Sequence, residues 1–175
     1  DHHLRSTVET IFAAGDVVEK KYRQIIESFQ EGYYEVDLAG NFIFFNEALR
    51  KDYGYDAEKL MGMNNREFTS PEIVKKAGAV FSQVYRTGLP DEIDNYEVIR
   101  QDGAIATITL SVSLLRDEKG TPIGFYGISR DVTEKRRFEQ ALRESERKYR
   151  TTLDAMQDGY YEIDLSGNMV FFNEA

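Results

Sequence analysis

The sequence contains no cysteine, no tryptophan and only two histidines. Without cysteine the chain cannot form a disulfide, a thiolate nucleophile, a thiolate zinc site or a thioether-linked haem. The two histidines, His2 and His3, stand at the extreme N-terminus, where chain ends fray. We therefore expect neither a Ser-His-Asp triad nor a histidine-ligated metal in a folded core.

Long apolar runs and a cationic balance are missing as well. No stretch approaches the ~20 apolar residues that span a bilayer, and no secretory leader pattern is recognisable. The 31 acidic residues outnumber the 22 basic ones, so the formal net charge is −9. Because broad nucleic-acid binding needs a cationic footprint, no nucleic-acid partner is expected. These features predict a soluble, cytoplasmic fragment without membrane contact.

What the sequence does contain is enough apolar residues for one core and a clear internal repeat. Its 175 residues are 41% hydrophobic, which suits one ordinary domain with extensions. Residues 21–48 recur at 148–175, with an offset of 127 residues and identity at 17 of the 28 aligned positions. A unit of that length is a domain plus its linker and not a solenoid turn. The chain is therefore predicted to hold one complete module and the opening of a second.

Two segments with heptad spacing flank the module. Apolar residues recur at alternating steps of four and three over residues 4–29 and again over 138–156, with weak seam positions at Gly15, Ser145 and Thr152. The spacing predicts a homodimer through parallel coiled coils. Helices that fold back onto their own sheet are the alternative.

Between these segments the pattern predicts an α+β module, in which one five-stranded antiparallel sheet carries helices on one face. The expected strands are residues 32–38, 42–45, 94–100, 104–115 and 122–130. Asn46 is expected to cap a short helix, and Ser70-Pro71 to begin a longer helix that ends at Gly88. Residues 42–45 are apolar on both faces, so a flanking helix is expected to cover the outer face there. Asp131 is expected to open the final helix.

This order of elements, together with three stretches of sequence, resembles a PAS domain of the sensory-box type. The stretches are DLAGNFIFFNEA, YGYDAEKLMGM and RQDGAIATITLSVSLLRDEKGTPIGFYGISRDVTEKR. The resemblance covers residues 22–134. It leaves 1–21 and 135–150 as linker helices and 151–175 as the truncated start of a second PAS domain.

The resemblance implies a sensory module of a bacterial multidomain signalling protein, and not an enzyme in itself. The output domain that it implies is most often a histidine kinase, less often a cyclic-dinucleotide enzyme or a transcription activator. Our hypothesis for its mechanism is a relay, in which the last strand shifts and Asp131 and Thr133 pass the shift to the following helix. A ligand-free dimerisation spacer is the alternative.

The residue types available limit the cofactor within that family. No cysteine can form a flavin adduct, and the long helix lacks the histidine that commonly holds haem in this family. Tyr85 or Met63 could ligate iron in principle, but packing is their more ordinary role. No bound cofactor is therefore expected, which leaves an unidentified small organic ligand. The pocket candidates are Tyr34, Phe81, Tyr85, Ile108, Leu110 and Phe125, and a filled core is the alternative.

The second copy of the repeat predicts a separate behaviour. Its apolar hairpin, residues 159–172, cannot stand alone in water as two strands. We expect it to be disordered, to pack against the first module, or to exchange with the matching hairpin of another chain.

Overall fold

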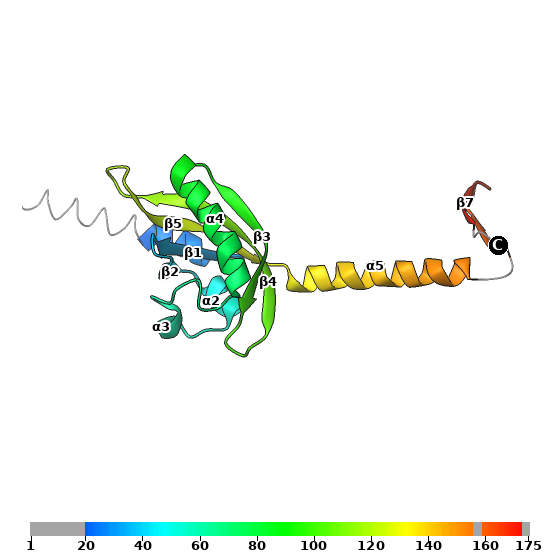
Figure 1. Ribbon diagram of the computed structural model, residues 1–175, viewed down its shortest axis with the longest axis horizontal. Helices are drawn as coiled ribbons and strands as arrows, with labels where there is room; N and C mark the ends of the chain where they lie inside the picture. Colours follow the sequence, from blue (N-terminus) through cyan, green and yellow to red (C-terminus); the bar gives the residue numbers. More distant parts are fainter. Residues whose placement is uncertain (1–19, 156–158, 173–175) are drawn as a thin grey trace, which may run out of the picture. The chain divides into compact units, whose positions relative to one another are not determined.

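The structure is a computed structural model that describes residues 20–155 and 159–172 and divides into two compact units (Figure 1). The first unit runs to Val132 and contains a helical segment, residues 20–27, followed by the elements β1 to β5. The second begins at Thr133 and contains the long helix α5 and a hairpin. The first 19 residues of the expected N-terminal linker helix lie outside the described residues.

A five-stranded antiparallel sheet forms the centre of the first unit. Its strands are β1 (Gly32–Asp37), β2 (Phe42–Phe45), β3 (Asp91–Ile99), β4 (Ile105–Arg116) and β5 (Pro122–Asp131). They lie in the order β2-β1-β5-β4-β3, and every neighbouring pair is antiparallel. The predicted α+β class and its single sheet are therefore confirmed, and β5 occupies the middle of the sheet.

Three helices connect β2 to β3, and their ends follow the predicted capping signals. In α2 (Glu47–Tyr53) the Asn46 side chain accepts a hydrogen bond from the Leu49 N–H. Helix α3 (Ala57–Leu60) is a single turn. In α4 (Pro71–Thr87) Ser70 caps the first turn and Gly88 ends the helix in the left-handed conformation. Figure 1 shows α4, in green, lying across one face of the sheet.

Strand β3 begins three residues earlier than predicted, at Asp91 instead of Asp94. The pairing of β3 with β4 shifts between Ile93 and Tyr96, and Asn95 between them has a φ of 57°. This bulge places the buried side chains of Ile93 and Tyr96 three residues apart instead of two. The regular alternation that identifies a strand in a sequence is therefore broken at that point.

The helical segment over residues 20–27 covers the outer face of β1 and β2. The Arg23 guanidinium lies 5.4 Å from the centre of the Phe44 ring, and the Tyr22 hydroxyl lies 3.1 Å from that of Tyr33. Ile26 is buried. This packing explains why residues 42–45 are apolar on both faces, as the sequence predicted. The helix stops at residue 27, two residues earlier than expected.

The second unit begins with α5 (Thr133–Asp154), which is followed by β6 (Tyr161–Ile163) and β7 (Met169–Phe172). Asp131 is the last residue of β5, so it ends a strand and does not open the helix as predicted. Over residues 20–155 and 159–172, no helix is both long and apolar enough to cross a membrane.

Candidate functional site

Between α4 and the sheet lie three hollow spaces that differ in the residues lining them. An internal void of about 10 Å³ lies deepest. A hollow of about 80 Å³ lies between α4 and the β1–β2 turn. A groove of about 360 Å³ continues along α4 towards its C-terminus and shares Leu38, Phe81 and Phe125 with the hollow. The void is about large enough for one water molecule, so the core itself is nearly filled.

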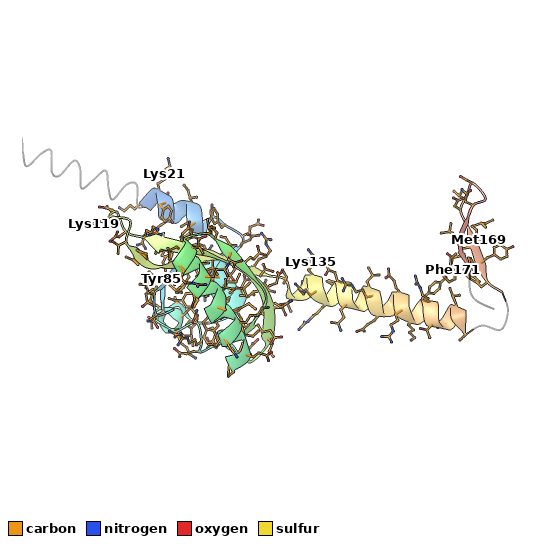
Figure 2. All side chains as sticks on the ribbon, turned by 45° about the horizontal axis from the view of Figure 1, so that its top comes forward. Lys21, Tyr85, Lys119, Lys135, Met169 and Phe171 are labelled. Atoms are coloured by element: carbon orange, nitrogen blue, oxygen red, sulfur yellow. The ribbon has the colours of Figure 1, made fainter. Side chains whose placement is uncertain are left out.

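The predicted pocket residues are distributed unevenly among these spaces. Tyr34, Phe81 and Leu110 line the void, whereas Phe81, Tyr85 and Phe125 line the groove. Ile108 is 1% exposed and packs in the core without lining any of the three. Tyr85 is 50% exposed at the groove wall on α4 (Figure 2). The sequence-based prediction thus combined residues of a packed core and residues of a groove into one pocket.

The groove and hollow face a single stripe of α4 that comprises Val74, Gly78, Phe81 and Tyr85. A Cβ atom on Gly78 would meet no atom within 4 Å. Glycine within a helix costs about 1 kcal/mol relative to alanine, and no steric contact requires it here. Gly78 is exposed at the edge of the hollow, so a larger side chain there would narrow the mouth of the hollow.

Leu38 and Asn65 belong to the site although the sequence did not indicate them. Leu38 follows β1, is 49% exposed and lines both the hollow and the groove. The Asn65 carbonyl accepts a hydrogen bond from the Tyr96 hydroxyl, and Asn65 lines both the hollow and the void. Both residues lie in turns and loops, where no periodic pattern indicates which side chains face inward.

Three buried tyrosines place hydroxyl groups around the void. Burial raises the pKa of Tyr96 to about 12 and also raises the pKa of Tyr34 and Tyr53, so all three hydroxyls stay neutral at physiological pH. The Tyr53 hydroxyl lies 3.3 Å from Ser129 Oγ. The Tyr34 hydroxyl donates to the Ser111 carbonyl at 2.7 Å. The walls of the void are therefore aromatic, and the hydroxyls are hydrogen-bonded to the surrounding strands and loops.

An ion pair closes the other end of β5, where the chain leaves the module. Arg100, after β3, pairs with Asp131, whose side chain is 22% exposed. Burial first and the Asp131 charge second raise the pKa of Asp52 on α2, while the Arg100 charge lowers it. The Arg100 Nε is buried and makes no hydrogen bond with the described residues. The Arg100 guanidinium therefore joins the residue after β3 to the last residue of β5.

The lining residues suit an organic ligand better than a metal. Among the described residues no group of three or more histidine, cysteine or acidic side chains could hold a metal ion. The groove offers leucine, phenylalanine and tyrosine side chains, with Arg66 in the hollow and Arg86 in the groove. Apolar walls with a few polar groups are typical of sites for small organic molecules.

Comparison with known proteins shows to which family the chain belongs. A probable diguanylate cyclase, DgcE of Escherichia coli (strain K12), is 28% identical over 155 residues and covers 86% of the chain, which spans only 14% of that protein. The PAS domain of a protein from Colwellia psychrerythraea is 24% identical with a TM-score of 0.58, and the match covers 67% of this chain and 98% of that structure.

A sensory box histidine kinase/response regulator from Burkholderia thailandensis E264 has the same fold. It is 20% identical with a TM-score of 0.57, and the match covers 75% of this chain and 98% of that structure. The family described as the PAS fold matches residues 26–137, which is more than half of the chain. The protein therefore belongs to the PAS fold family.

Proposed function

We propose that this PAS module detects a small organic ligand in the hollow and groove beside α4 and relays its presence through β5 to α5. The observation that carries the proposal is the position of Phe125. Its ring lines the groove and packs edge-on against Phe81 of α4, with ring centres 4.9 Å apart. Phe125 lies near the start of β5, and the same strand ends at Asp131. A molecule that separates Phe81 from Phe125 therefore acts directly on the strand that leads out of the module.

The proposed relay ends at the two residues that the sequence indicated. Asp131 is fixed to Arg100, and Thr133 begins α5. Val132 between them donates its N–H to the Thr107 carbonyl at 2.9 Å, so the chain remains tied to β4 until the helix starts. A shift of β5 against β4 would therefore change where and how α5 leaves the sheet.

The output domain is proposed to be a histidine kinase, with a cyclic-dinucleotide enzyme as the alternative. The sensory box histidine kinase/response regulator from Burkholderia thailandensis supports the first, and the probable diguanylate cyclase supports the second. The proposed place of the module is in the cytoplasm, where it senses upstream of a separate enzyme.

Native mass spectrometry of the purified protein tests the ligand proposal. We expect a non-covalently bound molecule on the wild-type chain and its loss in Gly78→Leu, because a leucine side chain there narrows the mouth of the hollow. Since leucine is also the better helix former, the variant is expected to be at least as stable as wild type. Lys75→Leu, at an exposed position of the same helix, should retain the molecule.

A ligand-free dimerisation spacer is the second candidate. The void of about 10 Å³ favours it, because a filled core leaves no internal site. Absence of a bound molecule from wild type, together with no change in its melting temperature in a cell extract, would support the spacer and contradict ligand sensing.

A further inference from the structure

The hydrogen-bond ladder between β4 and β5 is interrupted in the middle of the sheet. Val132 donates to the Thr107 carbonyl, which fixes Thr107 and Val132 as a hydrogen-bonded pair. In antiparallel strands every second pair is hydrogen-bonded, so Ser111 and Ile128 should be one too. The direct pairing is seen up to Leu110↔Ser129 and resumes at Ser113↔Tyr126, but it is absent between Ser111 and Ile128.

Side chains take the place of the missing backbone bonds. The Ile128 N–H donates to Ser111 Oγ at 2.7 Å, and the Ser111 hydroxyl lies 3.5 Å from the Ile128 carbonyl. The Ser111 carbonyl accepts from the Tyr34 hydroxyl instead, at 2.7 Å. Tyr34 belongs to β1, so its hydroxyl reaches across β5 to contact β4.

Gly127 makes this arrangement possible. It lies opposite Tyr34 in the β1–β5 pairing, and a Cβ atom there would lie 1.9 Å from the Ser111 carbonyl oxygen. Any other residue would collide with the displaced carbonyl. The interrupted ladder therefore explains why residue 127 is glycine. A turn does not explain it, because the φ of Gly127 is not in the left-handed region.

A second arrangement of the same groups is available. If the Ser111 carbonyl turned back into the ladder, it would accept the Ile128 N–H, as in a regular sheet. The Tyr34 hydroxyl would then need another acceptor, and Tyr34 lines the void of about 10 Å³. With an acceptor supplied there, both arrangements satisfy the Ile128 N–H, the Ser111 carbonyl and the Tyr34 hydroxyl.

We propose that Tyr34 and Ser111 form a two-position switch in the β4–β5 ladder, and that a hydrogen-bond acceptor beside Tyr34, such as one water molecule in the void, favours the continuous ladder. The switch does not rest on the ligand of the proposed function, because Tyr34 lines neither the hollow nor the groove. A bound group can bias the switch only because it binds one position better than the other. In the continuous ladder, β5 is hydrogen-bonded to β4 without interruption up to Val132, three residues after Ser129.

NMR detection of scalar coupling across the hydrogen bond between the Ile128 amide nitrogen and the Ser111 carbonyl carbon tests the switch without any ligand. The coupling is expected to be absent in wild type and to appear in Tyr34→Phe, which removes the donor that holds the carbonyl out of the ladder. Ser111→Ala should also produce it, because the Ile128 N–H then loses the Oγ acceptor.

Tyr96→Phe is the matched control, since Tyr96 lines the same void and donates to the Asn65 carbonyl, away from the ladder. It should leave the coupling absent. Coupling in wild type, its absence from both switch variants, or its appearance in the control would each overturn the switch. None of these results bears on the bound molecule sought by mass spectrometry, so the two proposals fail separately.

Discussion

At the scale of residues, Arg100 holds the end of β5, where the chain leaves the module. Its guanidinium pairs with Asp131 at the end of β5 and lowers the pKa of Asp52 on α2. The two side chains of the pair are 31% and 22% exposed, so removing the Asp131 charge is expected to cost about 1 kcal/mol or less of stability.

We predict that Asp131→Asn lowers the pKa of Asp52. Burial still raises that pKa, but the contribution of the Asp131 charge is lost and that of Arg100 remains. A carboxyl-carbon NMR titration of Asp52 in the two proteins measures the change. Asp117→Asn, at the opposite end of the sheet, should leave the titration unaltered.

An Asp52 titration that is the same in Asp131→Asn and wild type would show that the Asp131 charge does not act on Asp52. In the full-length protein the same substitution should uncouple the output while sparing the fold. A variant that still switches normally would remove Asp131 from the relay.

Residues also show what the sequence could and could not reveal. Asn46 was predicted as a helix cap from its position alone, and its Oδ1 accepts from Leu49. The same side chain also accepts from the Tyr33 N–H and donates to the Ile26 and Glu31 carbonyls, which lie far away in sequence. Ser111 looked like one polar member of an alternating strand, because the contact with Tyr34 spans 77 residues. Local patterns identify caps and strand faces, whereas contacts between distant strands leave no periodic signal.

At the scale of elements, the β6–β7 hairpin repeats β1–β2 in detail. Its pairs Tyr161↔Phe172 and Ile163↔Met169 have the same register as the equivalent pairs of the first hairpin, 127 residues earlier. Both hairpins also have the same irregularity in register. Asp164 accepts from the backbone of Ser166 and Asn168 as Asp37 does from Ala39 and Asn41. The second hairpin nonetheless exposes its apolar face: Tyr161 is 64% exposed, whereas its counterpart Tyr34 is 3% exposed.

A glycine supports the interpretation that this hairpin is shaped to dock. Gly32 lies against Leu49 and the Ser129 carbonyl, where a Cβ would come within about 3 Å of both. Its counterpart Gly159 meets nothing within 4 Å. The proposal of a second PAS module accounts for a glycine that the present surroundings do not require.

Hairpin exchange between chains is expected to change the free energy very little. Each chain has two hairpins but only one β5 edge for them to dock on, so exchange leaves one hairpin undocked in every copy. Amide hydrogen exchange measures the balance at two matched bonds, Asp37 N–H to Asn41 and Asp164 N–H to Asn168, both 2.9 Å.

Without exchange, Asp37 should be protected about 100-fold more than Asp164, because a lone hairpin opens readily. Equal protection of the two amides would show that the two hairpins alternate on the same β5 edge, either within one chain or between chains. A mass measured by light scattering at rising concentration would then separate exchange between chains from exchange within one.

At the scale of the whole molecule, the flanking helical segments leave their seam residues uncovered. In the N-terminal segment Tyr22 and Ile25 are 50% and 49% exposed, while the neighbouring Ile26 is buried against the sheet. On α5, Phe138, Leu142 and Tyr149 are 73%, 61% and 53% exposed. One face of the N-terminal segment thus belongs to its own module, and the heptad face is available to a partner.

We predict that the chain forms a homodimer through the α5 seam and that Leu142→Glu weakens it. The substitution removes apolar burial from both copies and places two carboxylates across the seam, so the dissociation constant should rise at least about 100-fold. Thr151→Glu adds the same charge to α5 off the seam, where Thr151 is exposed, and should leave the dimer intact. Sedimentation equilibrium at several concentrations measures both. A wild-type chain that stays monomeric throughout would contradict the dimer, and equal weakening by the two substitutions would exclude the seam as its interface.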